Sequence, residues 1–161
     1  MENWQKQLNF DPLSPLTSSR NEAVEYFTKR DLLEEKVKPI GYIWQLPEVQ
    51  NILKNQQPDG SWKHPNTRKV IYPKHHYSLV ETWKHFRSLV ERYEFTKKHP
   101  TAEKTAEFLF SCQTDNGDIR GFISNQYATY YTGAVLALLT RAGYEDDPRV
   151  ERGFKWLLSM R

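Results

Sequence analysis

The sequence contains a single cysteine, Cys112, among its 161 residues, and no long apolar run. One cysteine excludes an intramolecular disulfide framework and a zinc site built mainly from thiolates. The absence of about 18 consecutive apolar residues predicts that no segment spans a membrane. The first ten residues, MENWQKQLNF, lack the apolar core of a signal peptide, so we expect a cytoplasmic location.

Aromatic residues make up 14% of the chain, whereas hydrophobic residues as a whole make up only 38%. Disordered chains are poor in aromatic residues, so this composition predicts a folded protein. The length fits one domain or part of a larger one. We expect an irregular N-terminal arm over residues 1–20 and one folded domain over residues 21–161.

Positive charge is concentrated in residues 63–98, which hold nine Lys and Arg against three Asp and Glu. Such a segment binds phosphate groups, including diphosphates or nucleic acid, or else forms a solvated basic surface. No helix-turn-helix, zinc-finger or RNA-binding motif accompanies it, so the sequence contains no nucleic-acid motif.

Hydrophobic spacing predicts an all-α protein. One example is the 4, 3, 4 and 3 spacing of Leu79, Trp83, Phe86, Val90 and Tyr93, which places these residues on one helix face. No stretch alternates with the period of a strand. The expected helices cover residues 21–37, 47–55, 74–93, 100–112 and 126–142, with a last helix capped by Asp146 or Asp147.

Two segments repeat the pattern of Gln, three residues, Gly, one residue and a large apolar side chain. The first copy contains Gln56, Asp59, Gly60 and Trp62, and the second contains Gln113, Gly117 and Ile119. Glycine permits a tight reversal at positive φ, and an acidic or amide side chain caps the turn. The Gln amide is suited to bond the carbonyls at the helix end or the N–H groups of a neighbouring helix. We therefore interpret the pattern as a structural turn between helices.

The first copy, Gln56-x-x-x-Gly60-x-Trp62, resembles the QW motif of the squalene–hopene and oxidosqualene cyclases. Related repeats occur in protein prenyltransferase β-subunits. The resemblance covers roughly residues 47–161, although Ile119 replaces the tryptophan in the second copy. It implies a partial α/α toroid of about two and a half helical-hairpin units. It also implies that the chain is an N-terminal fragment, truncated at its C-terminus, of a terpenoid cyclase-like or prenyltransferase-like protein.

No complete active site is predicted in this chain, and no catalytic residue is assigned. The cyclase resemblance implies an Asp-x-Asp-Asp motif, but the acidic runs at 115–118 and 145–148 do not match it. Glu81 and His85, with His75 or His76 nearby, form the one local cluster with metal-binding residue types. Because the His-Glu-x-x-His spacing is missing, we favour a Glu–His surface pair and predict no metal and no cofactor.

The resemblance also suggests a ligand pocket at the ends of the two helices expected on the inner ring of a toroid. The residues expected to line it are His76, Tyr77, Glu81, Tyr127, Tyr130 and Tyr131. Aromatic faces there would hold an isoprenoid, another apolar ligand or a sugar, and the alternative is ordinary interhelical packing. Another hypothesis for the whole chain is a non-catalytic helical-repeat scaffold that binds proteins or carbohydrate.

The C-terminal segment carries apolar residues that a following repeat would cover, namely Phe154, Trp156, Leu157 and Leu158. A helical repeat buries its apolar face on its neighbour, so an unpaired last repeat leaves such residues exposed. We therefore expect a homodimer through this C-terminal edge. Cys112, near a helix end, is expected to be a small buried side chain rather than a nucleophile.

Overall fold

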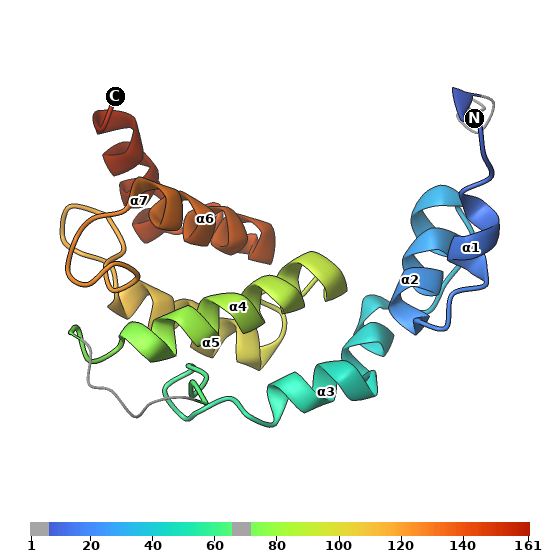
Figure 1. Ribbon diagram of the computed structural model, residues 1–161, viewed down its shortest axis with the longest axis horizontal. Coiled ribbons are helices and arrows are strands. Elements are labelled where there is room, and N and C mark those ends of the chain that lie inside the picture. The colour runs from blue at the N-terminus through green and yellow to red at the C-terminus, as the bar shows by residue number, and fades with distance from the viewer. Residues whose placement is uncertain (1–6, 66–71) are drawn as a thin grey trace. The chain divides into compact units, whose positions relative to one another are not determined.

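The computed structural model describes residues 7–65 and 72–161 (Figure 1). The chain forms two compact units, residues 1–46 and residues 47–161. The boundary therefore follows Leu46, whereas the sequence suggested a boundary after residue 20. Residues 1–6 of the expected arm and residues 66–71 of the expected basic loop lie outside the described residues.

The all-α prediction is confirmed for the described residues, which contain helices and two isolated β-bridges but no strand. The first unit contains α1 (Leu13–Thr17), α2 (Glu22–Phe27), the π-helical turn η2 (Thr28–Leu32) and the 3₁₀ helix η3 (Ile40–Gln45). The second contains α3 (Pro47–Leu53), α4 (His76–Tyr93), α5 (Pro100–Ser111), α6 (Thr129–Leu139), the π-helical turn η4 (Thr140–Tyr144) and α7 (Pro148–Ser159).

Two details of the first unit correct the sequence predictions. The expected irregular arm contains α1, whose first N–H group, from Leu13, donates to the Asp11 carboxylate at 2.9 Å. The helix expected over residues 21–37 begins as predicted, because the Asn21 side chain accepts from the N–H groups of Ala23 and Val24. It ends early, since Glu34 takes a left-handed conformation with φ of 54°. A left-handed residue terminates a helix even when it is not glycine.

Helices α5 and α7 of the second unit begin at prolines, which lack the N–H group that a first helical turn leaves unpaired. Pro100 opens α5 and Pro148 opens α7. The residue before each proline is the N-cap. His99 accepts from the N–H of Thr101 at 3.1 Å, and Asp147 accepts from that of Arg149 at 2.8 Å.

Helix α4 is the central element of the second unit, because it contacts α3, α5 and α6 (Figure 1). Leu79, Phe86 and Leu89 on α4 are fully buried, while Trp83 is only half-buried. Helix α6 also packs closely against α7, where Gly153 faces the side chain of Leu136. A Cβ at residue 153 would lie 2.7 Å from the Leu136 methyl groups, so glycine sets the approach of these two helices.

The two sequence repeats form turns with matching geometry. Gln56 pairs with Trp62, and Gln113 pairs with Ile119, each in an isolated antiparallel bridge. The glycine between them has a positive φ, 88° at Gly60 and 109° at Gly117. Both turns therefore use glycine for the conformation that the sequence pattern predicted.

Each Gln amide also joins its turn to the helix after next. The turn that follows α3 is bonded to α5, and the turn that follows α5 is bonded to α7. Gln56 Nε2 donates to the carbonyl oxygens of Gly60 and Thr101, both at 3.1 Å. Gln113 Nε2 donates to those of Gly117 and Arg149, both at 2.9 Å. The amide thus bonds the first turn of a neighbouring helix through a carbonyl group, whereas the sequence suggested its N–H groups or the carbonyls of the preceding helix.

Buried threonines attach the turns to a second helix each. The backbone N–H of Trp62 donates to Thr82 Oγ1 on α4 at 3.0 Å, and that of Ile119 donates to Thr132 Oγ1 on α6 at 3.1 Å. The contacts therefore run from the end of α3 to α5 and α4, and from the end of α5 to α7 and α6. Sequence reasoning did not identify these two threonines.

Candidate ligand-binding pocket

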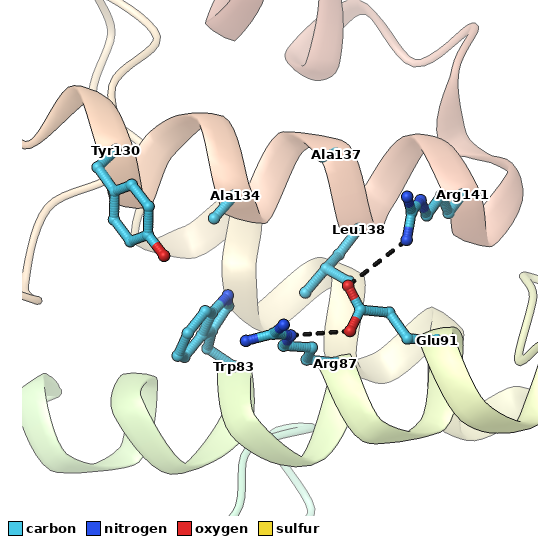
Figure 2. A pocket seen from close by; sticks show the side chains of 8 residues that line it. All are labelled: Trp83, Arg87, Glu91, Tyr130, Ala134, Ala137, Leu138 and Arg141. Atoms are coloured by element: carbon cyan, nitrogen blue, oxygen red, sulfur yellow. Dashed lines mark hydrogen bonds and ion pairs between the residues drawn. The ribbon is translucent and has the colours of Figure 1, made fainter.

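A pocket of about 180 Å³ lies between α4 and α6 (Figure 2). Its lining consists of Trp83, Arg87 and Glu91 from α4, and of Tyr130, Ala134, Ala137, Leu138 and Arg141 from α6 and the adjoining η4. Figure 2 shows the aromatic side chains near one end and the charged side chains near the other. The pocket is therefore polarised along the helices, with an apolar end and an ionic end.

At the ionic end, one carboxylate serves two guanidinium groups. Arg87 Nε donates to Glu91 Oε2 at 2.8 Å, and Arg141 Nη1 lies 3.5 Å from Glu91 Oε1 (Figure 2). The hydrogen bond that Arg87 donates to Glu91 raises the pKa of Arg87 above its ordinary value, so Arg87 is charged at neutral pH. One negative charge therefore faces two positive charges, which leaves this end of the pocket with a net positive charge.

At the apolar end, Trp83 lies in a group of aromatic rings. Its ring makes edge contacts with Phe122 and Tyr131, each at a centroid distance of 6.1 Å. The Arg87 guanidinium lies 5.7 Å from the Trp83 ring centroid. These contacts hold the indole at the wall of the pocket.

The Trp83 indole N–H is buried and has no hydrogen-bond partner. Figure 2 shows the indole nitrogen on the edge of the ring that faces α6, with the Tyr130 hydroxyl pointing toward it from above. By contrast, the buried Trp62 indole donates to the carbonyl oxygen of Ile52 at 2.9 Å. Leaving a buried donor unpaired costs about 1–3 kcal/mol, so the Trp83 N–H is an unusual feature of this pocket.

A second hollow, of about 450 Å³, shares Trp83, Arg87 and Glu91 of α4 with this pocket. It is lined by Ile52, Trp83, Lys84, His85, Arg87, Ser88, Glu91 and Arg92. Three basic side chains of the segment 63–98, those of Lys84, Arg87 and Arg92, thus gather on this surface of α4. The local excess of positive charge favours an anionic partner over a cationic one.

Of the three tyrosines expected in the pocket, at and just before the start of α6, only Tyr130 lines it. It is 71% exposed and touches Tyr131 edge-on, at a centroid distance of 5.2 Å. Tyr131 stacks on Phe122 at 4.5 Å, while Tyr127 contacts the Trp156 ring at 6.1 Å. Tyr131 therefore packs against a neighbouring ring, whereas Tyr130 is exposed at the wall of the pocket.

The expected residues at the start of α4 lie apart from this pocket. His76 Nδ1 is 2.6 Å from the carbonyl oxygen of Gly121, and the Tyr77 ring contacts His64. Glu81 is buried and lies 3.1 Å from His85 Nε2 and 3.2 Å from Lys84 Nζ. Trp83, Arg87, Glu91 and Arg141 were not selected from the sequence as pocket residues.

Within the described residues, no three side chains of His, Cys, Asp or Glu gather as a metal site requires. Glu81 and His85 form the expected Glu–His contact, but Glu81 is buried and His85 partly buried, so the pair does not lie on the surface as expected. Burial lowers the pKa of His85, which keeps the imidazole largely neutral at pH 7. Cys112 is buried as predicted, and burial raises the pKa of its thiol to about 11, which disfavours the nucleophilic thiolate.

Comparisons of the chain with protein-family models, with curated proteins and with solved structures gave no match. Among residues 7–65 and 72–161, no helix is both long enough and apolar enough to cross a bilayer. The functional argument therefore rests on the residues of this chain.

Proposed function

We propose that residues 47–161 are part of a terpenoid cyclase-like or prenyltransferase-like α/α toroid, and that the α4–α6 pocket binds an isoprenoid diphosphate or a similar ligand. The single observation that carries the ligand proposal is the polarity of the pocket. Trp83, Tyr130 and Ala134 offer an apolar end, and Arg87 with Arg141 offers a cationic end. A ligand with a hydrocarbon part and an anionic head matches both ends.

Support for the repeat architecture comes from the matched turns at Gln56 and Gln113. The first turn joins the end of α3 to the start of α5, and the second joins the end of α5 to the start of α7. Contacts of this kind, repeated along a chain, are what a repeat protein needs to build a continuous core. The proposal assigns binding, and not catalysis, to this chain.

The size of the pocket sets which part of such a ligand it holds. About 180 Å³ is below the ~300–1,000 Å³ typical of sites that enclose a drug-sized ligand. The pocket therefore suits the head group and the first prenyl unit, and the remaining chain extends outside it.

Isothermal titration with farnesyl diphosphate, farnesol and inorganic pyrophosphate tests this proposal. We expect farnesyl diphosphate to bind more tightly than either half-ligand, because only the complete ligand uses both ends of the pocket. Arg141→Gln should weaken binding, while Arg161→Gln, a matched loss of charge at the last residue, should not. Absence of heat with farnesyl diphosphate would refute the ligand proposal.

The alternative proposal, a protein-interaction scaffold, is favoured by the apolar surface of α7. Phe154 and Leu158 lie one helical turn apart and are 39% and 57% exposed. We propose that this edge forms a homodimer. Sedimentation velocity over a concentration series should then show a dimer that Phe154→Glu disrupts, and a monomer at all concentrations would contradict it.

A further inference from the structure

We infer that Glu91 occupies the place of a ligand's anionic group, and that binding exchanges this carboxylate for the anionic group between Arg87 and Arg141. This inference rests on the proposed function of the α4–α6 pocket and names the regulation of the same site. In the free protein, Glu91 is then a built-in competitor of the ligand.

The charges at the ionic end support the exchange. Arg87 is held by Glu91 at 2.8 Å, but Arg141 reaches the same carboxylate only at 3.5 Å. The long contact leaves most of the hydrogen-bonding capacity of Arg141 unused by Glu91. A phosphate or diphosphate carries more negative charge and more acceptor oxygens than one carboxylate, so it pairs better with two guanidinium groups.

The exposure of the partners makes the exchange feasible. The Arg87 and Arg141 side chains are exposed, and Glu91 is partly exposed. Ion pairs between such side chains are worth only about 0–1 kcal/mol. An incoming anion therefore has a weak pair to displace, and the released Glu91 carboxylate rotates into solvent.

The unpartnered indole of Trp83 supplies the second half of the inference. Its N–H is buried without an acceptor, beside the Arg87 guanidinium that lies against the ring. When Arg87 moves from Glu91 to the ligand, the indole edge becomes accessible from the pocket. A ligand oxygen then accepts from Trp83 Nε1, which converts an unpaired donor into a charge-assisted hydrogen bond.

The experiment measures farnesyl diphosphate and inorganic pyrophosphate binding by isothermal titration to the wild type, Glu91→Gln and Glu151→Gln. Glu151 pairs with Lys155 at 2.7 Å on exposed α7, so its substitution is a matched loss of one carboxylate outside the pocket. We expect Glu91→Gln to bind about three- to tenfold more tightly, because the competing charge is removed. Glu151→Gln should bind as the wild type does.

A third variant, Trp83→Phe, keeps an aromatic wall and removes the indole N–H. We expect it to bind about three- to tenfold more weakly, because an N–H donated to an anion contributes to affinity. Trp156→Phe, on α7, is the matched control and should bind normally. Urea unfolding of each variant shows whether a changed affinity follows from lost folding.

The outcomes separate this inference from the proposed function. If the wild type binds farnesyl diphosphate and Glu91→Gln binds it equally or less tightly, the exchange is wrong and the proposed function stands. If the wild type binds farnesyl diphosphate and Glu91→Gln binds it three- to tenfold more tightly, the inference is supported. If no variant binds farnesyl diphosphate or pyrophosphate, both the proposed function and the inference are overturned.

Discussion

The turns at residues 56–62 and 113–119 have the same backbone hydrogen bonds but differ in the apolar residue that follows the glycine. Trp62 in the first and Ile119 in the second are both about 1% exposed. The indole of Trp62 also bonds the carbonyl of Ile52, a contact that an isoleucine does not offer. The comparison teaches that the turn forms with either apolar residue, because the glycine, the Gln amide and the threonine bond are common to both turns, and that the tryptophan adds packing and a hydrogen bond.

Truncating Trp62 should lower the free energy of unfolding more than any other change to the two turns, including truncation of Ile119. Trp62→Ala should lower the free energy of unfolding by about 3–5 kcal/mol, and Ile119→Ala by about 2–4 kcal/mol. The tryptophan loses more buried surface and also its hydrogen bond to Ile52. Urea unfolding of both variants measures the difference, and a larger cost for Ile119→Ala would contradict the role assigned to Trp62.

Replacing the glycines should affect the two turns in the same way. An added Cβ at Gly60 would overlap the carbonyl oxygen of Lys104, and one at Gly117 would lie 2.5 Å from that of Arg152. With the cost of a positive φ, each alanine variant should lose about 2–4 kcal/mol of unfolding free energy in a urea titration.

Gly133→Ala is the matched control for these glycine variants. Gly133 lies within α6 and faces open packing, 3.7 Å from the nearest atom of Leu157. Alanine there should leave the stability unchanged or raise it by about 0.5–1 kcal/mol. Equal costs for Gly60→Ala and Gly133→Ala would mean that the turn geometry is not required.

The Gln amides are expected to contribute less than the glycines. Gln56→Leu and Gln113→Leu should each cost about 1–2 kcal/mol, because helix-start carbonyls lose a partly buried donor. Gln57→Leu is the control, since its amide donates only to the exposed carbonyl of Asn55. Chemical denaturation of the three variants measures their free energies of unfolding. A loss for Gln57→Leu as large as that for Gln56→Leu would show that the Gln of the motif has no particular role in the turn.

The smallest expected effect is on how the free energy of unfolding depends on pH. The turns contact the starts of α5 and α7, whose N-caps, His99 and Asp147, are both titratable. Burial lowers the pKa of His99 below 6.5, and Arg149 lowers that of Asp147 below 3.8. Between the folded and unfolded pKa values of His99, only the unfolded chain binds the proton. The stability that neutral His99 contributes is therefore complete above pH 6.5 and is lost as the pH falls through its folded pKa.

His99→Asn tests this effect, because asparagine is a good N-cap that does not titrate. Thermal unfolding from pH 7 to pH 5 should show a shallower loss of stability in the variant. Part of the slope should remain, since burial also lowers the pKa of His85. An unchanged slope would show that His99 does not contribute to the acid sensitivity.

The sequence predicted the helices of the second unit well because their hydrophobic spacing is a local signal, as are the proline starts of α3, α5 and α7. It missed the early end of the helix at Glu34, since a positive φ at a glutamate has no composition signal. It placed Trp83 on the apolar face of its helix, and the indole instead forms the wall of an open pocket. Periodicity identifies a helix face but not how far a neighbouring helix covers it.

The ionic end of the pocket was not predictable from spacing alone. Arg87 and Glu91 are four residues apart, a pattern that usually marks a solvated helix pair. Arg141 joins them only because α6 packs against α4, which brings together residues 50 positions apart. The repeat motif, by contrast, was visible because all of its residues lie within one turn.

In the proposed pocket Trp83 is a ligand contact, whereas Trp62 is a structural residue, and the indole N–H signals of the two residues distinguish these roles directly. Two-dimensional ¹H–¹⁵N NMR, assigned with Trp83→Phe and Trp62→Phe, follows both signals during a titration with farnesyl diphosphate. We predict that the Trp83 signal shifts downfield as its N–H gains an acceptor, while the Trp62 signal, already bonded to Ile52, stays in place. A titration that leaves the Trp83 signal unmoved would contradict the proposed pocket.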